Sequence, residues 1–182
     1  MSQLRPPLGP QDHVQGNPRA PIRLVEYGDY ECPYCGRAHR IVKALQEALG
    51  DDLLFAWRNF PLSQVHRHAL RAAAAAEAAG LQDRFWEMHD MLFEHQDALD
   101  DADLLAYAEV LGLDVERFAG DLDSVGIAER VRADFLSGAR SGVNGTPTFF
   151  VNGERYDGSW DPDTFLEYLR DLRSEAAPAG LP

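Results

Sequence analysis

The chain contains 182 residues, 45% of them hydrophobic, and carries a formal net charge of -13 at pH 7. This length and hydrophobic content fit one compact globular unit that carries an insertion. The 30 acidic residues outnumber the 17 basic ones and no Lys/Arg cluster occurs, which argues against nucleic-acid binding. No apolar run approaches the roughly 18 residues of a membrane span, so no membrane partner is expected.

The N-terminal segment is rich in proline and lacks the apolar stretch of a secretory signal peptide. We therefore expect a cytoplasmic protein, or an exported one if a leader was trimmed from the sequence. Residues 1–13 and 175–182 are rich in proline, glycine and alanine. Both ends of the chain are expected to be loose.

A strand followed by a helix is predicted in the first third of the chain. Residues 22–27 have the apolar and β-branched content of a short strand, and residues 28–31 follow as a turn. The helix is predicted to start at Cys32 and to stop at Gly50, which suits a C-cap. One apolar face of this helix is formed by Ala38, Ile41, Val42, Leu45 and Leu49.

The only two cysteines of the chain, Cys32 and Cys35, stand two residues apart at the predicted start of this helix. A disulfide between them would close a very short loop and would therefore stabilise the fold little. The spacing instead suits a redox pair in which one sulfur attacks a substrate and the other resolves the mixed disulfide. The helix N-terminus favours a thiolate at Cys32, whereas Cys35, one turn deeper, is expected to titrate at higher pH. Pro33 and Tyr34 are expected to tune the stability of the Cys32 thiolate.

The middle of the chain is predicted to be helical. Residues 51–60 read as a second, parallel strand, which completes a βαβ unit. Apolar residues then recur at helical spacing in four segments, 63–79, 82–95, 104–111 and 127–135. The aromatic stripe in residues 82–95 is expected to be core rather than a peptide-binding groove.

Near the C-terminus a second strand pair and a last helix are predicted. Strands over residues 148–151 and 154–156 are joined by Asn152-Gly153, and a helix follows with Asp161 as cap and Pro162 at its first position. Pro147 precedes the first of these strands, where a residue without an amide N–H is tolerated. A cis Thr146–Pro147 bond would bend the chain and leave nearby backbone groups free to pair with a substrate.

The CxxC pair at a helix start, together with Gly-Thr-Pro before a strand, resembles the thioredoxin superfamily. The long helical segment between these two motifs makes residues 14–174 similar to DsbA-like thiol-disulfide oxidoreductases. The resemblance implies an α/β, thioredoxin-like fold with a central mixed β-sheet and a helical insertion between the βαβ unit and the cis-Pro ββα unit. Residues 14–62 and 140–174 would form the thioredoxin-like domain, and residues 63–139 the inserted helical domain.

The resemblance also implies roles for individual residues. Cys32 would be the attacking cysteine and Cys35 the resolving one, while Thr146 and Pro147 would contact the substrate. Glu26 matches the family's buried acid, which would assist proton transfer to and from Cys35. No cofactor is implied. The expected partners are protein or peptide disulfides or dithiols and a recycling thiol system.

Three function classes remain open at this point. The leading one is a thiol-disulfide oxidoreductase that acts on protein or small-molecule substrates through a Cys32 mixed disulfide. A glutathione-linked transferase or isomerase of the kappa type resembles the same architecture but typically has serine in place of the cysteine. The third is a non-enzymatic peptide-binding module or Cu(I) carrier on the same fold.

No structural metal site is predicted. Two cysteines fall short of a tetrahedral zinc site, and His39, one turn beyond Cys35, is expected to face solvent. The direction of electron flow, as an oxidase, reductase or isomerase, is left open by the sequence. The physiological substrate, the recycling partner and the oligomeric state are left open as well.

Overall fold

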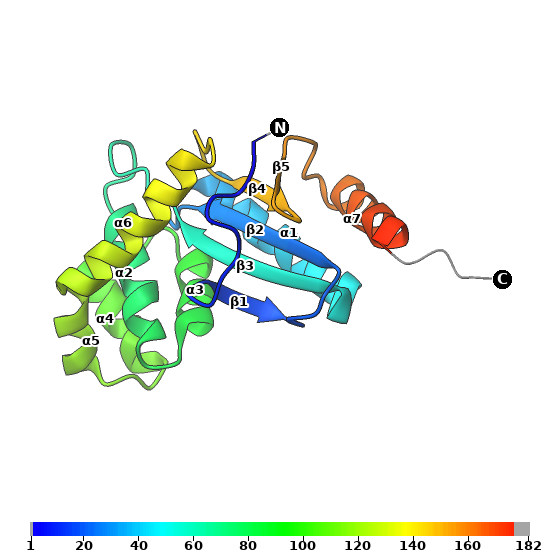
Figure 1. Ribbon diagram of the computed structural model, residues 1–182. Helices are drawn as coiled ribbons and strands as arrows, with labels where there is room; N and C mark the ends of the chain where they lie inside the picture. The colour runs from blue at the N-terminus through cyan, green and yellow to red at the C-terminus, as the bar shows by residue number, and fades with distance from the viewer. Residues whose placement is uncertain (1, 177–182) are drawn as a thin grey trace.

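A computed structural model describes residues 2–176 and contains a five-stranded mixed sheet (Figure 1). The strands follow the order β1-β3-β2-β4-β5, in which only the pair β2 and β3 is parallel. Their bounds are β1 His13–Gly16, β2 Ile22–Gly28, β3 Leu53–Asn59, β4 Thr148–Val151 and β5 Glu154–Tyr156. The predicted α/β fold with a central mixed sheet is therefore confirmed.

Helices connect the strands of this sheet and follow the last of them. Helix α1 (Pro33–Leu49) connects β2 to β3 through a short 3-10 turn (Gly50–Asp52), and α7 (Pro162–Ala176) follows β5. Between β3 and β4 lie α2 Ala69–Gly80, α3 Phe85–Glu94, α4 Asp101–Val110, α5 Val115–Leu122 and α6 Val125–Arg140. None of the helices within residues 2–176 is long and apolar enough to cross a membrane.

The two faces of the sheet are covered by different parts of the chain. Because side chains alternate along a strand, Leu24 of β2 points to one face and Val25 to the other. Leu24 belongs to the larger core, with α1, α7 and the inserted helices, whereas Val25 packs with Leu4, Phe60 and neighbouring apolar residues. Figure 1 shows α1 behind the sheet and the N-terminal segment (dark blue) in front of it.

The N-terminal segment, which was expected to be loose, is held against the sheet from residue 2 onward. The Leu4 amide donates to the Gly153 carbonyl at 2.8 Å, and the Arg155 amide donates to the Ser2 carbonyl at 2.9 Å. Leu4 is buried in the smaller core. The segment therefore extends the pairing at the β5 edge, which composition did not indicate. Of the other predicted loose end, residues 175 and 176 belong to helix α7, and residues 177–182 lie outside the part of the chain described.

Arg58 fastens the N-terminal segment to the middle of the sheet. Its guanidinium is almost fully buried and makes a two-pronged contact with the Asp12 carboxylate, at 2.7 and 3.0 Å. It also donates to the Pro6 carbonyl at 3.0 Å and to the Tyr27 hydroxyl at 2.9 Å. A buried cation of this kind needs its anionic partner, because few other groups replace the lost hydration.

Replacing Asp12 by alanine is expected to lower the free energy of unfolding by about 3 to 5 kcal/mol, because Arg58 is left buried without its counter-ion. Urea denaturation followed by circular dichroism measures this loss. Asp123→Ala, which removes an exposed partner of Arg71, is the matched control and is expected to cost less than about 1 kcal/mol. Equal losses in the two variants would show that Arg58 does not anchor the segment.

Candidate active site

The two cysteines lie where β2 ends and α1 begins. Cys32 is the N-cap residue of α1 with an extended backbone (φ -72°, ψ 121°), and Pro33 takes the first helical position. The predicted place of Cys32 at a helix N-terminus is confirmed. Just before it, Gly28 lies against the Trp57 ring, where an added Cβ atom would come within 2.2 Å of the ring carbons. Position 28 therefore requires glycine, which has no Cβ atom.

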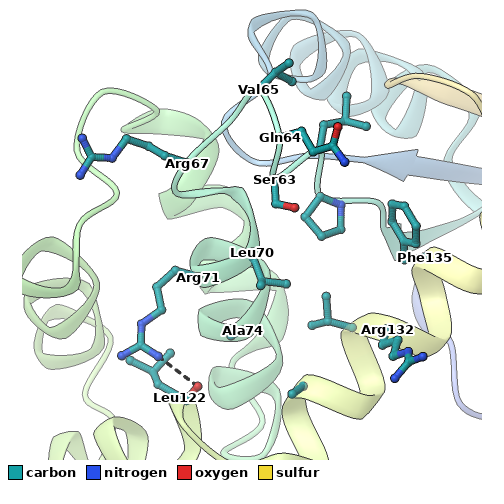
Figure 2. A pocket seen from close by; sticks show the side chains of 14 residues that line it. Ser63, Gln64, Val65, Arg67, Leu70, Arg71, Ala74, Leu122, Arg132 and Phe135 are labelled. Carbon is teal, nitrogen blue, oxygen red and sulfur yellow. Dashed lines mark hydrogen bonds between the residues drawn. The ribbon is translucent and has the colours of Figure 1, made fainter.

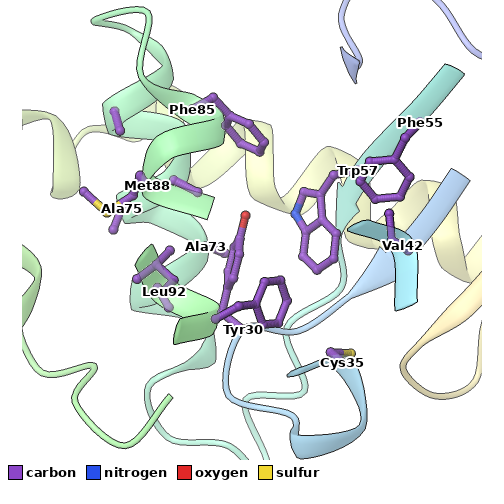
Figure 3. Packing of buried hydrophobic residues seen from close by; sticks show 14 of the residues in the cluster. Tyr30, Cys35, Val42, Phe55, Trp57, Ala73, Ala75, Phe85, Met88 and Leu92 are labelled. Carbon is purple, nitrogen blue, oxygen red and sulfur yellow. The ribbon is translucent and has the colours of Figure 1, made fainter. Parts of the chain in front are cut away.

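The two thiols differ in access to solvent. Cys32 retains 4% of its surface exposed, Cys35 retains none, and the two sulfurs are not bridged. Figure 3 shows Cys35 at the edge of the buried cluster that contains Tyr30 and Trp57. Pro33 and Tyr34 are exposed on the first turn of α1, beside the accessible thiol. A substrate can therefore reach Cys32 before Cys35.

Hydrogen bonds favour the thiolate form of Cys32. The Cys35 thiol donates to the Cys32 sulfur and the amides of Cys35 and Tyr34 add to it, which outweighs burial and lowers the pKa of Cys32 to about 5. The Thr146 side chain lowers the pKa of Cys32 as well, and the carbonyl of the same residue lies 3.6 Å from the Cys32 sulfur. The predicted direction of the pKa shift agrees with this environment.

The environment of Cys35 favours its protonated form. Burial raises the pKa of Cys35 well above its ordinary value, and the hydrogen bond to Cys32 and the negative charge of Glu26 raise it further. The Asp29 amide donates to the Cys35 sulfur at 3.4 Å, which opposes the rise only in part. The pair therefore consists of one thiolate and one thiol near neutral pH.

Glu26 is a buried acid on the same side of the sheet as α1. It stands two residues after Leu24 on β2, so its side chain points to the face that α1 covers. Burial, followed by the negative charge of Cys32, raises the pKa of Glu26 to about 8. Its Oε1 atom has no hydrogen-bond partner within residues 2–176. The acid is poised to hold a proton at neutral pH and to release it above.

The loop before β4 meets the cysteines from the far end of the chain. The Thr146–Pro147 peptide is cis, and the Thr146 carbonyl contacts the Cys32 sulfur across 114 residues of sequence. The Thr148 hydroxyl closes this loop by donating to the Gly145 carbonyl at 2.7 Å. The structure thus brings together Cys32, Cys35, Thr146 and Pro147, as the sequence predicted.

Asp29 ties the active-site turn to the loop that follows β3. Its buried carboxylate accepts hydrogen bonds from the amides of Glu31 and Leu62 and pairs with His66 Nδ1, each at 2.8 Å. A parallel contact joins Glu31 to the amide and ring of His68, at 2.6 and 2.9 Å. Burial raises the pKa of Glu31, but the hydrogen bonds from His68 outweigh it and lower that pKa.

These contacts explain a difference from the sequence prediction. A helix was predicted over residues 63–79, whereas α2 begins at Ala69. The backbone before Ala69 forms turns because Leu62 and His68 donate their amides to Asp29 and Glu31. Such long-range partners leave no mark on local helical spacing.

Gln96 also binds the active-site turn and was not singled out from the sequence. Its amide donates to the carbonyls of Tyr30 and Cys32, at 2.8 and 2.9 Å. Gly36 makes room for it, since a Cβ atom there would lie 2.0 Å from Gln96 Oε1. Asp29 was read only as a turn residue. Asp29 lies three residues before Cys32, but the Leu62 and His66 partners of its carboxylate are remote in sequence, as Gln96 is from the cysteines.

Within residues 2–176, one group of side chains has the spacing of metal ligands, and it excludes both cysteines. It consists of His39, His89 and Asp90. His39 was expected to face solvent but is buried and stacks on Phe93 at 4.9 Å between ring centroids. The Lys43 ammonium already pairs with Asp90 at 2.7 Å, which disfavours a second cation there.

The chain matches known proteins in sequence. The sequence profile of the thioredoxin family covers residues 9–171. Over 171 residues the chain is 44% identical to the Na(+)/H(+) antiporter NhaA 1 of Mycobacterium sp. (strain KMS), which is 93% of this chain and 28% of that protein. Another protein of that name, from Salinispora arenicola (strain CNS-205), is 50% identical over 87% of this chain and 24% of its own length. The chain thus spans about a quarter of the curated relatives it matches.

Solved structures share the fold over nearly the whole chain. Oxidised BdbD from Bacillus subtilis has a TM-score of 0.83 and 26% identity, covering 96% of this chain and 98% of that one. A thioredoxin-like oxidoreductase from Silicibacter pomeroyi DSS-3 has a TM-score of 0.79 and 28% identity, covering 94% and 95%. For α-DsbA1 from Wolbachia pipientis the TM-score is 0.80 at 23% identity, with 93% and 94% covered.

The family profile, the solved structures and the cysteine pair at the start of α1 agree with one another. The chain belongs to the thioredoxin family, and its fold is that of the DsbA-like thiol-disulfide oxidoreductases.

Proposed function

We propose that the chain exchanges its Cys32–Cys35 disulfide with the thiols of protein or peptide substrates and acts as an oxidant. The observation that carries this proposal is the opposite pKa shift of the two cysteines, down to about 5 for Cys32 and well above the ordinary value for Cys35. A stable Cys32 thiolate favours the reduced pair, and a pair whose reduced form is stabilised withdraws electrons from its substrates.

The proposed reaction has two displacement steps. A substrate thiolate attacks Cys32 of the oxidised pair, forms a mixed disulfide and releases Cys35, which takes up a proton. A second substrate thiolate then attacks the substrate sulfur of the mixed disulfide and releases Cys32 as a thiolate. The substrate leaves with a disulfide, and its two electrons reside on the reduced pair until the oxidised, disulfide form of a recycling thiol system accepts them and is itself reduced.

Thr146 and Pro147 are the proposed substrate contacts. The Thr146 carbonyl already lies 3.6 Å from the Cys32 sulfur, so a substrate chain joined to that sulfur would run beside this loop. If the substrate backbone pairs with the backbone of this loop, the peptide is bound without a requirement for a particular side chain. Exposed Pro33 and Tyr34 would form the other side of the entrance.

Glu26 is proposed to move the proton that Cys35 gains and loses. With a pKa raised to about 8, it is protonated at neutral pH and can deliver its proton when Cys35 is released as a thiolate. In the reverse direction the carboxylate accepts the proton of the Cys35 thiol. Glu26 would thus act through Cys35 and would leave the attack on Cys32 unaffected.

The Cu(I)-carrier alternative is disfavoured by the environment of Cys35. A two-sulfur copper site requires both cysteines as thiolates. Burial holds Cys35 in its protonated form, so such a site would have to overcome that cost.

Cys32→Ser is expected to abolish thiol-catalysed reduction of insulin while the far-ultraviolet circular dichroism spectrum stays unchanged, because the variant has no attacking thiol. Cys35→Ser is expected to accumulate a mixed disulfide with substrate, visible as a mass adduct on non-reducing electrophoresis, since the resolving thiol is gone. Insulin reduction by Cys32→Ser at the wild-type rate would contradict the mechanism.

The pH dependence of Cys32 alkylation tests its thiolate character. In the reduced protein the rate with iodoacetamide is expected to be half-maximal near pH 5 and constant above about pH 7, because only the thiolate reacts. In the protein unfolded by guanidinium the midpoint should move to about pH 8.5. Cys35→Ala removes the main donor and should raise the midpoint of the folded form. A wild-type midpoint above pH 7 would refute the assignment.

Glu26→Gln is expected to stabilise the reduced protein at pH 8 by about 2 to 4 kcal/mol and to leave its stability at pH 4 unchanged. The folded-state pKa of Glu26 is raised, so folding favours its protonated form and stability falls as pH rises from 4.5 toward 8. Glutamine does not ionise, so the variant does not lose stability over this pH range. Urea unfolding at the two pH values measures this difference.

The same variant separates proton transfer from attack at Cys32. Resolution of the mixed disulfide should slow and lose its inflection near pH 8, whereas alkylation of Cys32 should proceed at nearly the wild-type rate. A stability gain of equal size at pH 4 and pH 8, or an unchanged resolution rate, would remove Glu26 from the proposal.

A further inference from the structure

A hollow of about 890 Å³ opens between the loop that follows β3 and helices α2 and α6 (Figure 2). Most of its lining is apolar and comes from segments far apart in the sequence: Leu62, Leu70, Ala74, Leu122, Val131 and Phe135. We call this hollow the α2–α6 groove. Its residues are distinct from the cysteines, Glu26 and the Thr146–Pro147 loop.

The shape of the α2–α6 groove is built into the core of the protein. Ala74 lies on its floor, where the short side chain of an alanine-rich helix leaves space open. Phe135 forms part of a wall and stacks on buried Phe60 at 4.4 Å between ring centroids. Two apolar side chains at the edges remain largely exposed, Leu70 at 53% and Val65 at 74%. A ligand that covered them would gain hydrophobic contact.

Positive charge lies at the rim of this apolar hollow. Figure 2 shows Arg67 and Arg132 on opposite sides of it. Neither has a carboxylate partner within 4 Å among residues 2–176, whereas Arg71 beside them is paired with Asp101 and Asp123. In a chain of net charge -13, two unpaired guanidinium groups at an apolar hollow complement a ligand that is both apolar and acidic.

The α2–α6 groove is connected to the active-site turn through its loop wall. Leu62, which lines the groove, donates its amide to Asp29, and His66 of the same loop pairs with that carboxylate at 2.8 Å. Asp29 in turn donates its amide to Cys35. A chain held in the groove therefore contacts the same loop that positions the turn before Cys32.

We propose that the α2–α6 groove binds an extended segment of the substrate polypeptide, with leucine- or phenylalanine-like side chains in the hollow and Asp or Glu beside Arg67 and Arg132. The inference rests on the proposed function, because it names the substrate class of that reaction. Unfolded chains present such apolar segments together with their cysteines. The groove would thus select substrates that are not yet folded.

Direct binding is tested with two fluorescent, cysteine-free peptides that share leucine and phenylalanine residues and differ only in flanking Glu or Lys. Anisotropy titration of the wild-type protein is expected to give at least fivefold tighter binding of the Glu peptide, a preference that shrinks in 0.5 M NaCl. Arg132→Glu leaves Arg67 opposite a negative charge and should abolish the preference. Equal affinities of the two peptides, or no binding of either, would overturn the proposal.

A matched pair of leucines locates the binding site. Leu70 and Leu81 lie near opposite ends of α2 and are 53% and 54% exposed, but only Leu70 lines the groove. Leu70→Ser is expected to weaken the Glu peptide about tenfold, as loss of one buried leucine contact would, whereas Leu81→Ser should bind normally. Equal effects in both variants would refute the location. Self-association that Leu70→Ser abolishes, without peptide binding, would assign the groove to a second copy and overturn the proposal.

Kinetics separate this inference from the proposed function. Leu70→Ser should raise KM for oxidation of a reduced, unfolded protein several-fold, while kcat and the rate with dithiothreitol stay at wild-type values. A wild-type chain that oxidises neither substrate would refute the proposed function itself. An unchanged KM in Leu70→Ser, with wild-type activity intact, would refute only the groove.

Discussion

The burial of Cys35 in the first turn of α1 is the constraint on which the chemistry of this protein depends. Because Cys35 is fully buried it remains a thiol, and as a thiol it can donate to the Cys32 sulfur at the helix N-terminus. The same turn therefore holds Cys32 as a stabilised thiolate and Cys35 as a thiol. Glu26 is buried on the sheet face that α1 covers, and its charge raises the pKa of Cys35. In the proposed reaction it would exchange a proton with that thiol.

Asp29 connects the active-site turn to the inserted helices. It is buried between the active-site turn and the loop before α2, and it uses its amide and its carboxylate to hold both. Position 29 thus links Cys35 to the wall of the α2–α6 groove. Substrate recognition and thiol chemistry would share this one residue, although neither sulfur contacts the groove.

Local patterns predicted the fold where the determining contacts are local. The strand at residues 22–27, the helix from Cys32 to Gly50 and the hairpin after Pro147 have clear apolar periodicity or turn residues, and all are present. Strand β1 was missed because its four residues are mostly polar and pair only with β3. Gln96 and the ordered N-terminal segment were missed because their partners are remote in sequence, and remote pairing has no local signature.

The reduction potential of the Cys32–Cys35 pair, measured in a glutathione redox buffer, tests the central claim most directly. If the Cys32 thiolate stabilises the reduced pair, the potential should lie nearer to the value of about -120 mV for DsbA than to about -270 mV for thioredoxin. Cys35→Ser cannot form the pair and serves as the blank. A potential close to that of thioredoxin would contradict the account, because it would mean that the folded protein does not favour the thiolate.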